Sequence, residues 1–122
     1  MRADVRVDRG VSKYGAKKSL VDGISFASKA EASRYLELKA LERAGRIRDL
    51  VLQPRFLLIP SKRRPDGVLE RACHYVADFG YVGADGERVI EDTKGFATPD
   101  YIIKRKLMLD RLGIAVQEVR RK

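Results

Sequence analysis

The 122-residue chain lacks several features, and each absence narrows what the protein can be. It has no tryptophan, one cysteine and one histidine. The single cysteine, Cys73, cannot form an internal disulfide, and it cannot join with one histidine to make a structural zinc site of the usual Cys/His kind. The absence of tryptophan disfavours a platform that binds single strands by stacking bases on aromatic rings.

Long hydrophobic runs are also missing. No apolar stretch approaches the ~18 residues that a membrane span requires. Residues 1–9 mix aspartate with arginine and contain no apolar segment of the kind found in secretory signals. Because the lone cysteine indicates a reducing compartment, we expect a cytoplasmic protein with no membrane partner. A glycine-rich Walker loop is absent as well, which argues against a nucleotide-phosphate site of that class.

Positive charge is what the chain has in excess. Its 26 Lys and Arg residues outnumber 17 Asp and Glu residues, which gives a net charge of +9 and points to nucleic acid as the partner. The charge is uneven: residues 99–122 hold seven basic and three acidic groups, whereas residues 61–98 hold six and seven. The carboxylates crowd between Asp78 and Asp92. Because they would repel a phosphate backbone, a bound metal ion is the leading explanation for them.

The pattern of hydrophobic residues and turn signals predicts one folded domain over residues 20–122, preceded by a flexible basic arm over residues 1–19. Hydrophobic residues make up 44% of the chain, enough for a core. We expect an α/β or α+β fold, a small central mixed sheet flanked by helices. The expected elements are an edge strand at 24–26, a helix from Ser28 to about Ala44, an extended segment at 45–60 that breaks at Gln53-Pro54, a polar loop at 61–67, alternating strands at 73–82 and 88–94 joined by a turn at 84–86, a helix from Thr98-Pro99 to about Leu112, and a last strand at 114–119.

Asp78, Asp92 and Lys94 form the pattern that carries the most chemistry. Strand periodicity places Asp92 and Lys94 on one face of the second hairpin strand, and pairing lets Asp78 approach Asp92. Two facing carboxylates repel unless a cation lies between them, and Mg²⁺ prefers such oxygen ligands. A lysine beside the metal can orient or deprotonate a water, so these residues indicate metal-assisted hydrolysis of a phosphodiester. The alternative is that these aspartates only form turns or surface ion pairs.

Four segments in order resemble the PD-(D/E)XK nuclease superfamily, in particular small phage-borne endonucleases related to Holliday junction resolvases. They are Phe26-Ala-Ser-Lys-Ala-Glu31-Ala-Ser-Arg-Tyr35, Leu52-Gln-Pro-Arg-Phe56, Tyr75-Val-Ala-Asp-Phe79 and Glu91-Asp-Thr-Lys-Gly95. The resemblance covers about residues 20–119. The chain departs from the family signature at Ala77, where the signature has proline.

This resemblance implies a restriction-endonuclease-like domain that cuts DNA, selects branched substrates such as Holliday junctions, and acts in recombination as a homodimer. It implies that Asp78 and Asp92 bind Mg²⁺ or Mn²⁺ together with the backbone carbonyl of Thr93, that Glu31 completes the catalytic site, and that Lys94 is the catalytic lysine. The expected compartment is then the cytoplasm of a bacterium or of a phage-infected host.

Several alternatives stay open at this point. Glu31 follows Ser28 in a capping box, so it is either a metal ligand or only a helix cap. Glu91 adjoins Asp92, although the shared face with Lys94 favours Asp92. A non-cleaving DNA-binding module, a nuclease subunit of a larger complex and a phage-assembly protein are the rival functions. The candidate DNA-contacting residues, any of which could instead be structural or solvated, are Gln53, Tyr101, Lys104, Arg105, Lys106, Lys17 and Lys18.

Overall fold

The computed structural model describes the backbone of residues 19–94 and 97–120 and the side chains of residues 20–93 and 97–119. Nearly all of the basic segment predicted over residues 1–19, with Lys17 and Lys18, therefore lies outside the described residues. The fold is a mixed α+β domain, as predicted. Its elements are β1 (Ser19–Val21), β2 (Ile24–Phe26), α1 (Lys29–Arg43), β3 (Arg48–Leu52), β4 (Arg55–Ile59), β5 (Lys62–Arg63), β6 (Leu69–Glu70), β7 (Cys73–Val76), β8 (Phe79–Val82), β9 (Arg88–Lys94), α2 (Pro99–Leu112) and β10 (Gln117–Arg120).

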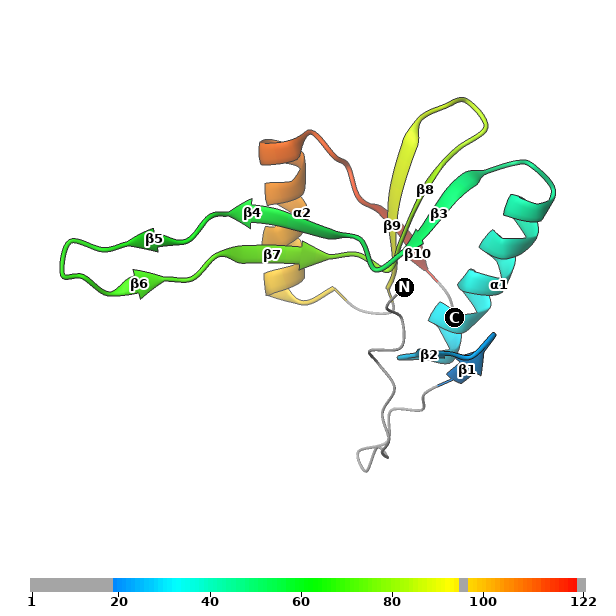
Figure 1. Cartoon of the computed structure of the whole chain (residues 1–122), viewed down its shortest axis with the longest axis horizontal. Helices are drawn as coiled ribbons and strands as arrows, with labels where there is room; N and C mark the ends of the chain where they lie inside the picture. The colour runs from blue at the N-terminus through cyan, green and yellow to red at the C-terminus, as the bar shows by residue number, and fades with distance from the viewer. Residues whose placement is uncertain (1–18, 95–96, 121–122) are drawn as a thin grey trace.

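A four-stranded sheet forms the centre of the molecule, with the strand order β10-β9-β8-β3 (Figure 1). The β10–β9 pair is parallel, and the other two pairs are antiparallel. Neighbouring residues on β8 point to opposite faces, because Phe79 packs with α1 while Gly80 lies against Ile90 on the face of α2. The sheet thus separates two hydrophobic cores, one under each helix.

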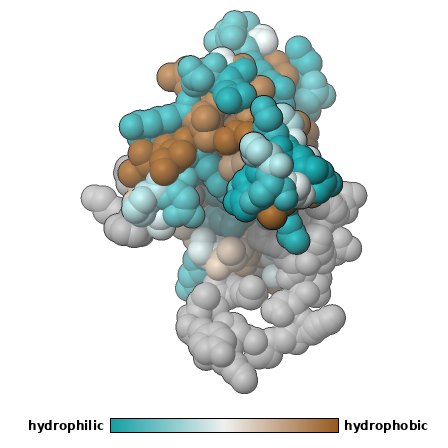
Figure 2. Space-filling view, turned by 90° about the vertical axis from the view of Figure 1, so that its left-hand side faces the viewer, coloured by the Kyte–Doolittle hydropathy of each residue, from teal (hydrophilic) through white to brown (hydrophobic). Residues whose placement is uncertain are grey.

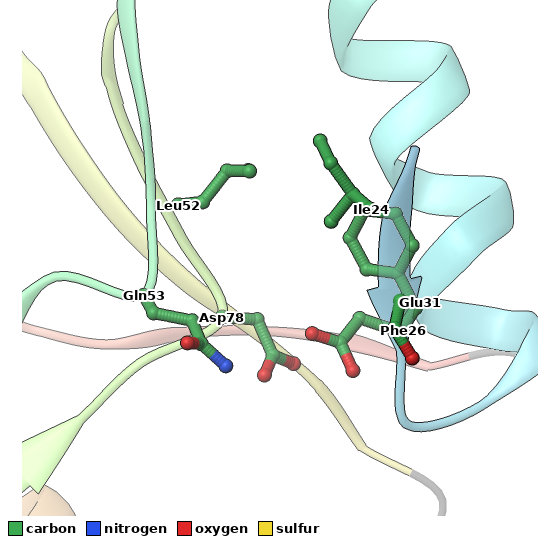
Figure 3. Close-up of a pocket in the computed structure, with 7 residues that line it drawn as sticks. Ile24, Phe26, Glu31, Leu52, Gln53 and Asp78 are labelled. Carbon is green, nitrogen blue, oxygen red and sulfur yellow. The ribbon is translucent and has the colours of Figure 1, made fainter. Parts of the chain in front are cut away.

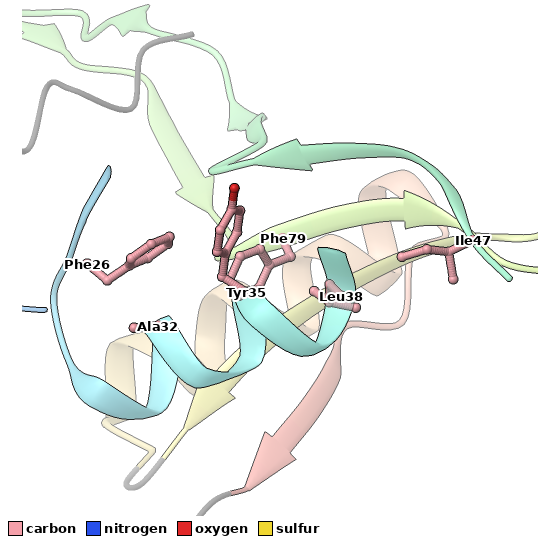
Figure 4. Packing of buried hydrophobic residues seen from close by; sticks show 6 residues of the cluster. All are labelled: Phe26, Ala32, Tyr35, Leu38, Ile47 and Phe79. Atoms are coloured by element: carbon pink, nitrogen blue, oxygen red, sulfur yellow. The ribbon is translucent and has the colours of Figure 1, made fainter. Parts of the chain in front are cut away.

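The core under α1 uses one stripe of that helix. Ala32, Tyr35 and Leu38 are three residues apart and all buried, and they pack with Phe26 and Phe79 (Figure 4). Ser28 caps the helix by accepting a hydrogen bond from the backbone N–H of Glu31, as the sequence predicts. The helix therefore begins and ends where the capping signals placed it.

The β1–β2 hairpin was not foreseen. Asp22 and Gly23 form its turn with φ angles of 53° and 77°, the left-handed conformation that a tight two-residue hairpin requires. The Tyr35 hydroxyl donates to the Asp22 carboxylate at 3.0 Å, which fixes the hairpin to α1. Burial, and next this hydrogen bond, raise the pKa of Tyr35 to about 12.

Two other predicted elements agree closely with the structure. The strand over Arg88–Lys94 is confirmed, and it follows a turn in which Gly86 has a φ of 87°. In α2, Thr98 caps the helix, and Gly113 ends it in the left-handed conformation. Glycine and proline signals fixed these boundaries because they act locally.

The prediction of one continuous strand over residues 73–82 is wrong. This segment is divided into β7 and β8 by Ala77 and Asp78, opposite the predicted break at Gln53-Pro54. Two backbone hydrogen bonds join the breaks: Gln53 N–H donates to the Asp78 carbonyl, and Ala77 N–H donates to the Pro54 carbonyl, both at 3.0 Å. The alternation of hydrophobic residues cannot show such a break, because it continues through both strands. The hydrophobic residues of the two strands are nevertheless buried in different cores.

We call the two facing breaks, at Gln53-Pro54 and at Ala77-Asp78, the double break. Beyond it, the long hairpin that begins with β3 and ends with β8 leaves the central sheet. We call residues 55–76 the β-arm; it contains β4 and β7, which pair over α2, and then β5 and β6, which extend past the body of the molecule (Figure 1). The polar loop predicted over residues 61–67 therefore contains a strand, and the last strand begins at Gln117, three residues later than predicted. In the described residues, no helix combines the length and hydrophobicity needed to traverse a membrane.

A buried charge network holds α1 against β9. Glu91 is only 1% exposed, and Arg34 donates two hydrogen bonds, of 2.7 and 3.0 Å, to its carboxylate. The Tyr81 hydroxyl donates a third at 2.6 Å. Burial, and next the bond to Glu91, raise the pKa of Tyr81 to about 12, and the hydrogen bond to Glu91 raises the pKa of Arg34. The bidentate geometry satisfies a carboxylate that would otherwise be costly to bury.

Replacing Arg34 tests this network. Arg34→Met leaves the Glu91 charge buried without its cation, so the free energy of unfolding should fall by about 3–5 kcal/mol. Urea denaturation followed by circular dichroism measures it. Arg46→Met, at an exposed arginine beyond the end of α1, is the control and should change stability by less than about 0.5 kcal/mol. Equal stability of the two variants would contradict the network's role.

Candidate functional site

Asp78 and Asp92 are joined by reciprocal hydrogen bonds at the double break. The backbone N–H of Asp78 donates to Oδ1 of Asp92 at 2.8 Å, and the backbone N–H of Thr93 donates to Oδ2 of Asp78 at 2.8 Å. Each carboxylate is thus positioned by the backbone beside the other. The structure brings together the two aspartates that the sequence pattern paired.

Tyr75 is a third member of this cluster, and the sequence did not reveal it. Its hydroxyl donates to Oδ2 of Asp92, whose side chain is buried at 2% exposure. Alternation along a continuous strand placed Tyr75 and Asp78 on opposite faces. The break between β7 and β8 removes that constraint, which is why Tyr75 and Asp78 both contact Asp92. No local signal could have revealed this contact.

A small, partly open hollow lies beside Asp78, with a volume of about 10 Å³, which is room for about one water molecule. Glu31 comes to it from α1, Gln53 from the bend after β3, and Ile24 and Phe26 from β2. Figure 3 shows the carboxylates of Glu31 and Asp78 turned toward each other, with the amide of Gln53 beside Asp78. Gln53 has a φ of 53°, so the bend itself directs this side chain. Three of the predicted site residues therefore share one hollow.

Glu31 acts in the helix cap and also lines this hollow. Its Oε1 accepts a hydrogen bond from the backbone N–H of Ala27 at 3.3 Å, one residue before the capping Ser28. The side chain is nevertheless buried at 6% exposure and lies among the residues that line the hollow. The two interpretations of Glu31 are therefore compatible in this structure.

Glu91 and Asp92 point to opposite sides of β9. Glu91 points toward α1, where Arg34 and Tyr81 bind it, while Asp92 contacts Tyr75 on the other side of β9. Consecutive residues on a strand face opposite sides, so only Asp92 can join Asp78. The preference for Asp92 over Glu91 rests on this geometry.

The donor atoms here suit a hard divalent cation. They are carboxylate oxygens, an amide oxygen and nearby backbone carbonyls, which Mg²⁺ and Mn²⁺ prefer over nitrogen or sulfur. The Thr93 hydroxyl, one residue after Asp92, is buried and has no hydrogen-bond partner in the described chain, which is unusual for a buried polar atom. In the residues that the structure describes, no three acidic, histidine or cysteine side chains converge into a ready metal cage. The described side chains therefore offer donor types that suit such a cation but no preformed cage for it.

The remaining predicted residues lie apart from the hollow or outside the described region. The side chains of Lys94, Lys17 and Lys18 are outside it. Tyr101 is buried in the α2 core, and its hydroxyl donates to Glu118 at 2.8 Å; burial raises its pKa. Arg105 pairs with the same Glu118 at 2.6 Å, whereas Lys106 is exposed and Lys104 half-buried.

A pair of substitutions separates the two roles of Glu31. Ser28→Ala removes the cap acceptor and should lower the free energy of unfolding by about 1 kcal/mol. Glu31→Gln keeps an oxygen that can accept from Ala27, so it should change stability by less than about 0.5 kcal/mol. Thermal and urea unfolding of both variants measure this. If Glu31→Gln destabilised the protein more than Ser28→Ala, its charge would be essential to the fold.

Comparison with known proteins gives a family without a function. Residues 11–120 match the model of a family described as "Protein of unknown function (DUF1064)". No protein of curated function matches the chain. No solved structure matches it either. Because the match spans nearly all of the sequence, the chain belongs to the DUF1064 family.

Proposed function

We propose that this protein is a metal-dependent DNA endonuclease that hydrolyses phosphodiester bonds. The observation that carries the proposal is the pair of hydrogen bonds that hold Asp78 and Asp92 together, which we call the clasp. It lies at the edge of the hollow that Glu31 and Gln53 line with Asp78. A carboxylate cluster is costly in a chain of charge +9 whose partner is a polyanion. A metal ion that bridges carboxylates and phosphate removes that conflict.

Asp78, Asp92 and the backbone carbonyl of Thr93 would hold Mg²⁺ or Mn²⁺, with Glu31 completing the site. Bound there, the ion supplies charge stabilisation and lowers the pKa of a water. The Glu31 and Asp78 carboxylates can accept hydrogen bonds from that water and orient it. The Gln53 amide can donate to a phosphate oxygen. Lys94 follows Asp92 by two residues on β9 and, as the catalytic lysine, would balance the charge that develops.

Tyr75 keeps Asp92 oriented through its hydroxyl, and the backbone N–H of Asp78 holds the other carboxylate oxygen. Each oxygen of a carboxylate has two lone pairs, so one hydrogen bond to an oxygen does not by itself prevent that oxygen from binding a cation. They also fix the side chain, which preorganises the site. The substrate class that we propose, branched DNA such as a Holliday junction, and a homodimer acting in recombination follow from the family resemblance.

A non-cleaving DNA-binding module is the second candidate. It is favoured by the burial of Asp92, since both of its oxygens already have protein partners and the side chain is 2% exposed. In that interpretation the clasp only holds the double break together. Metal dependence separates the two functions.

The decisive experiment incubates the protein with a four-way junction, a flap, linear duplex and single strands, in Mg²⁺, Mn²⁺ or EDTA. We expect cleavage that EDTA abolishes. Asp78→Asn, Asp92→Asn and Lys94→Ala should each reduce its rate about 100-fold or more. Glu31→Gln should lose activity while staying folded if Glu31 completes the site.

Asp110→Asn, which removes an exposed carboxylate from α2, is the matched control and should cleave normally. Metal binding has an independent readout, because Mg²⁺ or Mn²⁺ should raise the melting temperature of the wild type and not that of Asp78→Asn. Tight DNA binding without cleavage in any metal, and without a metal-induced shift in melting temperature, would establish the second candidate and refute the first.

A further inference from the structure

The outer half of the β-arm is a two-stranded ribbon with no support from the body. Every residue from 61 to 70 is exposed. Lys62 pairs with Glu70 and Arg63 with Leu69, and the ribbon extends well past α2 (Figure 1). A free hairpin of this kind is marginally stable in water. Some feature must therefore hold its shape.

That feature is the turn Arg64-Pro65-Asp66-Gly67. The N–H of Gly67 donates to the Arg64 carbonyl at 2.8 Å, and the Arg64 N–H donates to the Val68 carbonyl at 2.8 Å. Asp66 accepts from the Val68 N–H at 3.0 Å, and Gly67 has the φ of 91° that the turn needs. Proline fixes its own backbone in advance. The sequence thus stiffens a projection that buries nothing of its own.

The ribbon carries a surplus of positive charge. Residues 61–71 contain four basic and two acidic side chains, a net charge of +2. Arg64 binds Asp66 at 3.0 Å and Glu70 at 3.2 Å, and this arginine lowers the pKa of Asp66. Lys62 and Arg71 are exposed and make no ion pair within the described part of the chain. Figure 2, which views the molecule from the side of the β-arm, shows mainly hydrophilic residues on this face with a hydrophobic area among them.

Both strands of the β-arm start from the candidate site. Gln53 and Asp78 line the hollow, and they are also the residues whose backbones join where β4 begins and β7 ends. From Arg55 to Arg64 the chain advances about nine residues, or roughly 30 Å at ~3.3 Å per residue. One turn of duplex DNA is about 34 Å. The tip therefore reaches about one helical turn from the site.

We propose that the β-arm lies along duplex DNA that flanks the scissile phosphate and contacts the backbone within one helical turn of it, through Lys62 and Arg71. This inference rests on the proposed function, because it takes the scissile phosphate to lie at the mouth of the hollow. The side chains meet the phosphates, and a two-stranded ribbon is narrow enough to follow a groove. The DNA backbone presents a denser row of negative charge to Lys62 and Arg71 than a second copy of this chain, with its net charge of +9, would.

Binding measurements on uncleaved DNA test the proposal. Lys62→Gln with Arg71→Gln is compared with wild type by fluorescence anisotropy in Ca²⁺, on duplexes of about 8 and about 24 base pairs. On the longer duplex, the double variant should bind about 10-fold more weakly. Its plot of log affinity against log salt should be shallower by about 2, from ~0.9 per lost phosphate contact. On the shorter duplex, which cannot extend from the hollow along the β-arm, the loss should be much smaller.

Arg46→Gln with Arg111→Gln is the matched control, because it removes the same charge from exposed positions outside the β-arm. If this control weakened binding as much, or if the loss did not depend on duplex length, the proposal would be overturned. Sedimentation equilibrium tests whether a second copy of the chain binds the β-arm instead of DNA. If the wild type is a dimer and only the Lys62/Arg71 double variant dissociates, the β-arm is a dimer interface and the proposal is overturned. Normal length-dependent binding with no cleavage in Mg²⁺ or Mn²⁺ would instead refute the nuclease and leave the β-arm a DNA-binding element.

Discussion

The backbone hydrogen bonds at the double break are the constraint on which the rest of the structure depends. They hold the bend after β3 against the bend before β8, so one long hairpin serves two layers. Its inner half completes the central sheet, and its outer half covers α2 and becomes the β-arm. The same bends turn Asp78 toward Asp92 and Gln53 into the hollow. The shape of the molecule and the position of its acidic cluster therefore have one cause.

Two buried carboxylates on adjacent residues of β9 show how the sheet divides structural from chemical roles. Glu91 faces α1 and is neutralised by Arg34, so its charge holds the helix to the sheet. Asp92 faces the other side, where it accepts hydrogen bonds from the Tyr75 hydroxyl and the Asp78 N–H. Glu91 therefore serves the contact between helix and sheet, and Asp92 is the carboxylate of β9 that the proposed metal site would use.

The boundaries of elements that depend on local signals could be predicted well from the sequence. The caps Ser28 and Thr98, the left-handed Gly113 and the Asp85-Gly86 turn act over a few residues, so the boundaries of both helices and of β9 followed from them. The division of the 73–82 strand did not follow. Its hydrophobic residues alternate without interruption, and only the packing of Ala77 and Phe79 in different cores separates the halves.

The candidate site divides in the same way. The sequence by itself determined which residue types are present, the spacing of Asp92 and Lys94 on one strand face, and the excess of charge that indicates nucleic acid, because these depend on order and strand period alone. Only the tertiary structure decided that Glu31 and Gln53 meet Asp78 at one hollow, that Tyr75 binds Asp92, and that β5 and β6 extend past the body of the molecule. Those facts depend on where two distant backbone bends pair, and such pairing is a property of the folded chain.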